Sequence, residues 1–137
     1  MIKQKDVIRI KIPYPTINDK MALNSHMYIC RNSDINNYEL VKCQTLKPYM
    51  LINSPMVHYW DEIADITRNP FLHTTRIDCD KIFITRNVVY DDKLKTLSRP
   101  DVCDDVLESI EKELQIDGFD EVEISEEKLK IINSLIR

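Results

Sequence analysis

Hydrophobic and polar residues alternate over much of the first two-thirds of the chain, and this alternation predicts strands. Residues 6–12 read Asp-Val-Ile-Arg-Ile-Lys-Ile, with an isoleucine at every second position from residue 8, which is typical of a half-buried strand. Pro13 and Pro15 end this strand, because proline cannot donate to a β-ladder. Residues 16–25 are rich in turn-forming residues and are expected to form a loop.

Two further regions also have the pattern of strands. Residues 27–44 hold two apolar stretches around a polar turn, which predicts a β-hairpin. Residues 75–86 give the strongest strand pattern, but their apolar positions change parity near Asp80 and Lys81. Because side chains alternate between the two faces of a strand, this change predicts a bulge or a break at that point.

The spacing of apolar residues becomes helical in other parts of the chain. Residues 54–66 begin with Ser-Pro and continue with apolar residues at helical spacing, so we expect a short helix inserted between strands. Ser98 and Asp101 are arranged like a capping box and predict a helix that ends at Gly118. Another helix is expected to begin at Ser125. The fold class expected from this order is α+β and mainly β.

The composition fits one domain and excludes several kinds of nucleotide site. The chain has 137 residues, of which 43% are apolar, enough to bury one core. Gly118 is the single glycine, whereas average composition predicts roughly ten. Rossmann, P-loop and nucleophile-elbow motifs all need glycines at fixed spacings, so none of them is present.

Charge and cysteine content narrow the function classes further. Residues 1–90 hold 12 basic and 9 acidic residues, a net charge of +3, and residues 91–137 hold 7 and 14, a net charge of −7. The net positive charge of residues 1–90 therefore permits a nucleic-acid partner, whereas the net negative charge of residues 91–137 disfavours one. The four cysteines form no CxxC pair, so no metal site is expected. Without a signal peptide or long apolar run, a cytoplasmic protein with reduced thiols and no membrane partner is expected.

Candidate chemistry lies at the ends of the predicted strands. His26 stands between a polar loop and a strand, where a rigid scaffold often presents a reactive side chain, although an ordinary surface histidine is the commoner case. Thr45 ends the third predicted strand and is followed by Lys47. A hydroxyl and an ammonium group close together can hold a phosphate oxygen, but a solvent-exposed strand end has the same pattern.

Basic residues also recur along the first three predicted strands. If these strands are neighbours, their outward side chains form a basic patch that could follow a phosphate backbone. The patch would comprise Arg9, Lys11, Arg31, Lys42 and Lys47. Tyrosines near it could stack on bases, whereas the alternative is a solvated sheet face with the aromatic residues in the core.

The order of these elements matches a known pattern. The order strand, proline, loop, strand is present in KQKDVIRIKIPYP and the later HMYICRN. The next predicted strand ends in a threonine, in the segment ELVKCQT. RIDCDKIFITR carries an acidic pair before an isoleucine, and LKTLSRPDVCDDVLESIEKELQ places a leucine-serine segment before a helix. Over residues 3–115 this order resembles the PemK/MazF family of toxins from toxin–antitoxin modules.

The resemblance implies both a fold and an activity. The fold would be a small SH3-like β-barrel with its C-terminal helix over residues 1–116, and residues 117–137 would form an acidic helical extension. The activity would be cleavage of single-stranded RNA without a metal or another cofactor. An antitoxin protein and a second copy of the chain would be the protein partners, the latter forming a homodimer.

The resemblance also implies a catalytic site. The threonine of the family corresponds to Thr45, while the place of its arginine falls at Ser25 or His26. His26 would then act as acid or base, because an unperturbed histidine exchanges its proton near pH 6.5. The substrate-binding residues would be Arg9, Lys11, Ser25, Lys47 and Arg76.

Three functional hypotheses remain from the sequence. The first is an endoribonuclease toxin, and the second is a catalytically inactive or retargeted relative that binds RNA or protein. The third is an interaction protein that acts through its acidic helices. The missing arginine of the family distinguishes the first two, because either His26 replaces it or the activity is lost.

Overall fold

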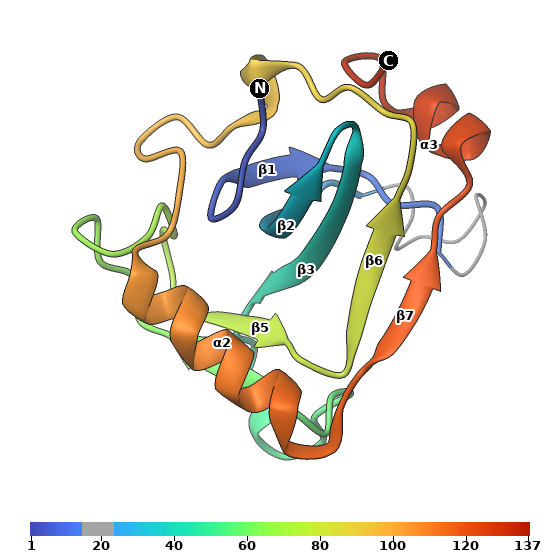
Figure 1. Cartoon of the computed structure of the whole chain (residues 1–137). Coiled ribbons are helices and arrows are strands. Elements are labelled where there is room, and N and C mark those ends of the chain that lie inside the picture. Colours follow the sequence, from blue (N-terminus) through green and yellow to red (C-terminus); the bar gives the residue numbers. More distant parts are fainter. Residues whose placement is uncertain (15–23) are drawn as a thin grey trace.

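A computed structural model describes residues 1–14 and 24–137, so the loop expected over 16–25 lies almost entirely outside the described residues. The described chain is mainly β, with one curled sheet and two α-helices (Figure 1), which confirms the α+β, mainly β fold class. The strands are β1 (Val7–Ile10), β2 (His26–Asp34), β3 (Asn37–Thr45), β4 (Tyr59–Glu62), β5 (Thr75–Asp78), β6 (Lys81–Thr85) and β7 (Asp120–Glu123). The helices are the 3₁₀ turns η1 (Pro48–Leu51) and η2 (Asp92–Leu94) and the α-helices α2 (Asp104–Asp117) and α3 (Glu126–Ile132).

The sheet is built around β3. Strands β1, β2 and β3 pair antiparallel in chain order, and β4 joins the sheet through β5. The hairpin predicted over 27–44 is confirmed, with Ile35 and Asn36 in the left-handed region at its turn. β7 adds to β6 in parallel, so the C-terminal part of the chain extends the same sheet.

The predicted interruption near Asp80 is confirmed as a break between two strands. The second half of β3 pairs with β5, where Cys43 faces Ile77, and the first half pairs with β6, where Leu40 faces Phe83. The β5–β6 segment therefore carries extra residues opposite β3 and changes parity there. This is the physical cause of the parity change seen in the sequence.

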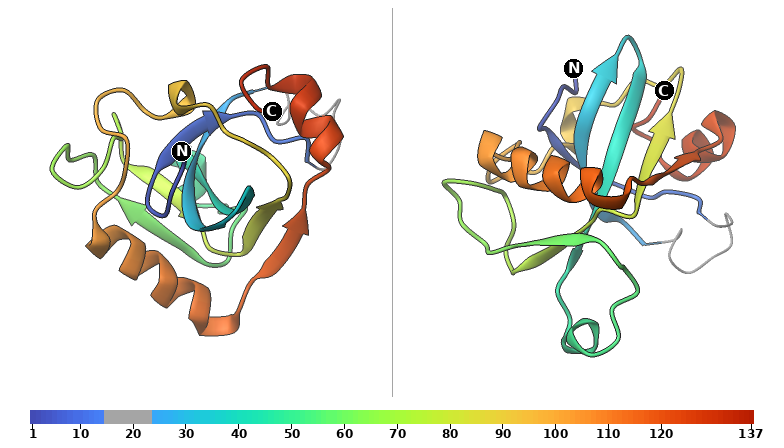
Figure 2. Two further views of the ribbon diagram at one scale, coloured as in Figure 1. Left: turned by 45° about the horizontal axis from the view of Figure 1, so that its top comes forward. Right: turned by 60° about the horizontal axis from the view of Figure 1, so that its bottom comes forward.

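Both faces of the central strands are buried, and each is covered by a different helix (Figure 2). One face packs beneath α3, through residues such as Ile8, Tyr28 and Leu129. The other packs beneath α2, through residues such as Val7 and Ile110. The first strand was expected to be half-buried, and this is confirmed from residue 8 onward: Ile8, Ile10 and Ile12 are buried, whereas Arg9 is exposed and Lys11 is half-buried. Val7, which precedes this alternation, is completely buried against the other helix.

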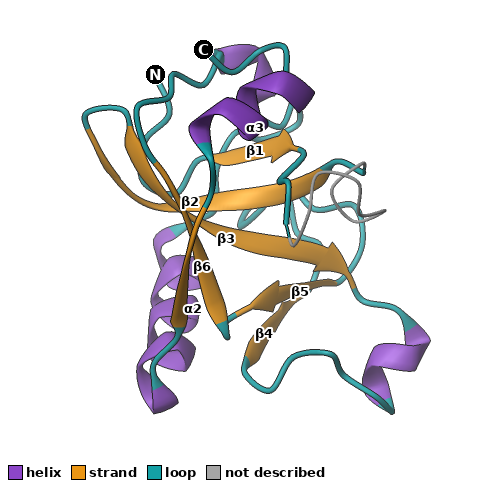
Figure 3. Cartoon of the chain, turned by 90° about the vertical axis from the view of Figure 1, so that its right-hand side faces the viewer, coloured by secondary structure: helices purple, strands orange, loops and turns teal. Residues whose placement is uncertain are grey.

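The helix expected over residues 54–66 is also wrong. Residues 59–62 form the strand β4, which pairs with β5, and Asp80 accepts the amide hydrogens of Val57 and His58 (2.8 and 2.9 Å). Ile63 and Ile66 are mainly exposed, whereas Met56 is buried and Trp60 packs against the core, so the residues of the expected apolar stripe do not share one buried face. Pairing with β5 therefore prevails over the local helix-start signal. The segment that connects β3 to β4 carries η1 and projects away from the sheet (Figure 3).

The α-helix before Gly118 begins later than its capping pattern predicts. Cys103, and not Ser98, precedes the first residue of α2. The preceding segment is held to the start of β1, since the amide of Val7 donates to the carbonyl of Pro100 (2.8 Å). Gly118 does end α2, with φ of 76°, a conformation that other residues rarely adopt.

Residues 117–137 contain more than the expected helix. They contribute β7 as well as α3, which begins next to Ser125 as predicted. The side chain of Ser125 caps this helix by accepting from the amide of Lys128 (3.3 Å). Leu129 and Ile136 belong to the same core as β1 and β2. All four cysteines are free thiols, and three of them are buried.

Candidate nucleic-acid interface

A groove with a volume of about 640 Å³ opens beside the end of β3, and we call it the cationic groove. Its walls come from β1, β2, β3, β5, the loop before β5, and the segment that contains η2. It is lined by Arg9, Met27, Thr45, Pro70, Leu72, His73, Thr75, Lys93, Leu94, Lys95, Thr96, Leu97 and Ser98. Among these described residues, every charged side chain belongs to a lysine or an arginine.

The register of the sheet brings the first of these side chains to one face. Arg9 pairs with Met27, and Met27 pairs with Cys43, two positions before Thr45. Residues directly opposite each other, or two apart on one strand, share a face of the sheet. Thr75 pairs with Thr45 and completes the row. Two hydroxyl groups and a guanidinium group therefore come to one side through strand pairing alone.

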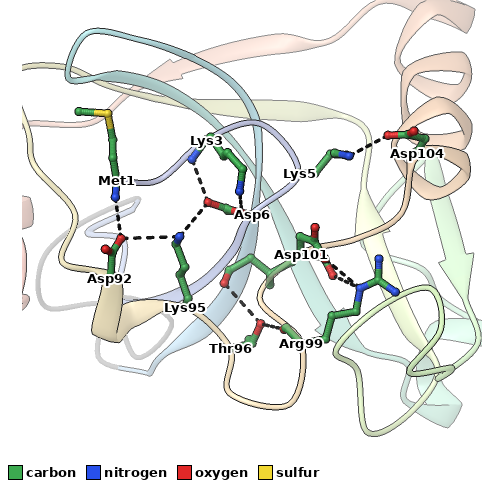
Figure 4. A network of polar contacts seen from close by, with 11 residues as sticks. Met1, Lys3, Lys5, Asp6, Asp92, Lys95, Thr96, Arg99, Asp101 and Asp104 are labelled. Atoms are coloured by element: carbon green, nitrogen blue, oxygen red, sulfur yellow. Dashed lines mark hydrogen bonds and ion pairs between the residues drawn. The ribbon is translucent and has the colours of Figure 1, made fainter.

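Arg9 and Lys95 supply positive charge to the groove in different ways. The side chain of Arg9 is exposed and makes no hydrogen bond or ion pair within the described part of the chain. Lys95 is held in place, because its Nζ lies 3.4 Å from Asp6 and 3.6 Å from Asp92 (Figure 4). The groove thus combines an adaptable cation with a fixed one.

Asp6 is the centre of the network that fixes Lys95. Its carboxylate is fully buried and accepts hydrogen bonds from the amide of Lys3 (2.9 Å) and from its Nζ (3.2 Å) (Figure 4). The backbone beside Lys95 is also attached to β1, since the amide of Thr96 donates to the carbonyl of Val7 (3.1 Å). One wall of the groove is therefore anchored to the first strand by both ionic and backbone contacts.

The hydroxyl groups of the groove differ in their availability. Thr75 donates to the carbonyl of His73 (2.9 Å), and Thr96 donates to the carbonyl of Arg99. The hydroxyl of Thr45 has no hydrogen-bond partner among residues 1–14 and 24–137. Hydroxyl, guanidinium and ammonium groups that face one cavity are the donors that bind phosphate oxygens.

His26 lies on the other face of the sheet from Thr45. It pairs with Ile10 and directly precedes Met27, whose side chain shares the face of Thr45. Its Nε2 is buried without a hydrogen-bond partner in the described part of the molecule. Burial lowers the pKa of His26 to about 4, and the positive charges of Lys42 and Arg9 contribute to this. The structure therefore does not bring the two predicted catalytic residues together.

Arg76, one of the predicted substrate-binding residues, has structural contacts instead. Its side chain is buried and forms a bidentate ion pair with Asp61, with both distances 2.8 Å. It also donates to the carbonyl of Met50 (2.9 Å), and its guanidinium carbon lies 3.7 Å from the centre of the Tyr59 ring. These contacts connect the η1 segment to β4 and β5 and leave Arg76 outside the cationic groove.

Three other predicted substrate-binding residues also lie outside this groove. Ser25 and Lys47 are both exposed, just before the start of β2 and just after the end of β3. Lys11 is half-buried, and its backbone exchanges two hydrogen bonds with the side chain of Asn133 (2.9 and 2.7 Å). Of the predicted site residues, the cationic groove contains Arg9 and Thr45.

The basic patch predicted for the first three strands does not form on one face. These strands are neighbours, but Tyr28 pairs with Lys42, which places Lys42 on the face opposite Arg9. Arg31 is bound to Glu111 (2.6 Å) and Glu39 (3.1 Å). Strand alternation and ion pairing therefore divide the predicted set.

Sequence reasoning missed several residues of the groove. His73, which precedes β5, lines the groove. Lys93, Lys95 and Thr96 come from the KLKTLS segment, whose mixture of cations and hydroxyls was a usable signal. Their role was hidden because only the tertiary structure places this segment beside β1.

No group of three or more histidine, cysteine, aspartate or glutamate side chains is placed to hold a metal ion in the described residues. None of the helices in that part of the chain has the length and apolar character needed to cross a membrane. Comparisons with protein-family models, curated proteins and solved structures find no match for this chain.

Proposed function

We propose that the protein binds single-stranded RNA, with the phosphates of the strand in the cationic groove. One observation carries this proposal: the charged side chains described in the groove are all cationic, although the whole chain has a net charge of −4. Such a local excess of positive charge attracts a phosphate backbone. Neighbouring hydroxyls add donors for phosphate oxygens or for the 2′-hydroxyl of RNA.

Exposed apolar residues in the groove favour a single strand over a duplex. Leu72 and Leu97 are 81% and 99% exposed at its border. The bases of a duplex are stacked and paired, whereas those of a single strand are free to contact apolar side chains. A groove that combines cations with exposed leucines suits a ligand with both phosphates and accessible bases.

The test is a salt titration of RNA binding. Fluorescence anisotropy with a labelled single-stranded RNA should give an affinity that falls linearly with salt on logarithmic axes. Arg9→Ala should weaken binding and reduce the salt slope by about one. Lys112→Ala is the matched control, because Lys112 is an exposed cation on α2, outside the groove. Equal effects of the two substitutions, or binding that ignores salt, would contradict the proposal.

RNA cleavage is the second candidate function. His73, Thr45 and Arg9 all line the cationic groove, so an imidazole accompanies the phosphate-binding groups. In the proposed reaction a base takes the proton of the 2′-hydroxyl, whose oxygen attacks the adjacent phosphorus. The bond to the 5′-oxygen breaks, that oxygen receives a proton, and a 2′,3′-cyclic phosphate remains. Groove cations would stabilise the charge that develops on the phosphate oxygens.

Product analysis separates the two candidates. Incubation of single-stranded RNA with the protein in EDTA should yield cyclic phosphate and 5′-hydroxyl ends if the protein is a metal-independent ribonuclease. Salt-dependent binding without these products supports an RNA-binding module. The SH3-like barrel, homodimer and antitoxin partner of the PemK/MazF resemblance belong to the second candidate, RNA cleavage, and the antiparallel order β1-β2-β3 is compatible with such a barrel.

A further inference from the structure

A second cavity, of about 320 Å³, lies on the face of the sheet opposite the cationic groove. Four of its lining residues are aromatic: Tyr14, Tyr28, Tyr49 and Phe83. We call it the aromatic pocket. Its volume is at the lower end of the range of small-molecule sites, about 300–1,000 Å³. The function proposed above does not use this pocket.

Three of the four aromatic rings are in contact with one another through Phe83. The ring of Phe83 meets those of Tyr14 and Tyr28 edge to face, with centroids 5.5 and 6.0 Å apart. Tyr28 and Phe83 are almost fully buried, while Tyr14 is 39% exposed and Tyr49 is 59% exposed. The buried rings are thus part of the core, and the two exposed rings can contact a ligand.

The polar lining of the pocket combines fixed charges with an available amide. Asp78 is buried, and its carboxylate accepts from Lys81 Nζ (2.8 Å) and from the amide of Asp80 (2.8 Å). These charges satisfy each other. The side chain of Gln44 is half-buried and forms no hydrogen bond within the described chain. Its amide therefore offers a donor and an acceptor to a ligand.

We propose that the aromatic pocket binds a single nucleobase. A nucleobase is planar and stacks on aromatic side chains, which suits the exposed rings of Tyr14 and Tyr49. Its edge carries adjacent donors and acceptors, which a glutamine side chain can match in pairs. A purely hydrocarbon ligand would use the rings but would leave the amide of Gln44 without a partner.

The position of Gln44 relates this pocket to the groove. Gln44 and Thr45 are consecutive in β3, so their side chains lie on opposite faces, one in the pocket and one in the groove. The base can therefore belong to a free nucleoside or to an RNA strand that passes the end of β3. The second source rests on the proposed function, whereas the first does not.

The experiment measures binding of the four neutral ribonucleosides by isothermal calorimetry and NMR titration. At least one should bind, and Tyr49→Ala should weaken its binding about tenfold or more. Gln44→Ala should weaken it as well and change the preference among bases. Leu51→Ala is the matched control, because Leu51 is 70% exposed on the same η1 turn and does not line the pocket. Arg9→Ala should leave nucleoside binding unchanged.

A second arm identifies the source of the base. If the pocket serves only a bound strand, free nucleosides will not bind. Tyr49→Ala will then weaken binding of intact RNA, whereas the natural protein and Tyr49→Ala will bind an abasic strand equally. The proposal is overturned if Tyr49→Ala and Leu51→Ala have equal effects on both nucleosides and RNA, or if neither ligand binds. Nucleoside binding without RNA binding would reject the groove proposal and retain this one.

Discussion

His26 and Thr45 come from neighbouring antiparallel strands, but their side chains lie on opposite faces of the sheet. The pair Met27 and Cys43 fixes this relationship, because His26 is one residue from Met27 and Thr45 is two residues from Cys43. One histidine is consequently separated from the groove, and another, His73, lines it. His73, and not His26, is therefore the histidine that lies beside the phosphate-binding groups proposed for the groove.

Substitution of the two histidines tests this assignment. His73→Ala should lower RNA affinity several-fold, and it should abolish cleavage if cleavage occurs, because His73 lines the cationic groove. His26→Gln should leave both properties unchanged, because His26 is on the other face. The measurements are anisotropy titrations and gel analysis of RNA products. Loss of activity in His26→Gln, with unchanged thermal stability, would restore His26 as the functional histidine.

The half-buried side chain of His26, with its buried Nε2, predicts a pH dependence of stability. Its pKa in the folded protein is lowered from 6.5 to about 4, first by burial and then by the charges of Lys42 and Arg9. As pH falls below 6.5, the unfolded chain binds a proton that the folded protein excludes, so the free energy of unfolding decreases towards pH 4. Urea unfolding at about pH 7 and pH 5 should show a larger loss for the natural protein than for His26→Gln. Equal losses would show that His26 titrates normally.

The carboxylate of Asp6 should contribute strongly to stability. It is fully buried and is bonded to Lys3 and Lys95. Asp6→Ala removes these charge-assisted contacts and should lower the free energy of unfolding by about 2 kcal/mol, measured by urea denaturation. Asp92→Ala is the control, because Asp92 is exposed and also contacts Lys95 (3.6 Å). A similar loss in both variants would show that the buried site of Asp6 has no special effect.

Arg76 should also act on stability and not on RNA binding. Arg76→Ala leaves the carboxylate of Asp61 without its bidentate partner and removes the contact with Tyr59. A loss of about 2–4 kcal/mol is expected in urea denaturation. Arg86→Ala, which removes an exposed ion pair with Glu123, should have little effect. If Arg76→Ala folds normally and weakens RNA binding more than Arg9→Ala does, Arg76 belongs to the binding surface.

Local patterns in the sequence determined much of the secondary structure. The hairpin over 27–44, the break near Asp80, the helix start at Ser125 and the stop at Gly118 are all confirmed. Each depends on residues that are close together in the chain, such as a parity change or a side chain that bonds a nearby amide. Such signals act without the rest of the fold, so the sequence alone reveals them.

Long-range pairing decided the elements that the sequence predicted wrongly. The Ser-Pro start at residue 54 favours a helix, but β5 provides backbone partners for residues 59–62. The capping pattern at Ser98 is likewise overruled by backbone hydrogen bonds between residues 96–102 and the start of β1. In both places, hydrogen bonds with a distant segment outweigh a local preference of about 1 kcal/mol.

The candidate site was also predicted from the sequence only in part. The sequence by itself indicated Arg9 and Thr45 as candidate phosphate-binding residues and determined which residues of a strand share a face. It did not determine which strands are adjacent, in which register, or what lies beside them. The tertiary structure therefore decided that His26 is separated from Thr45, that Asp61 holds Arg76, and that a segment near residue 95 completes the groove. A groove depends on contacts between segments far apart in the chain, and those contacts form only when the core packs.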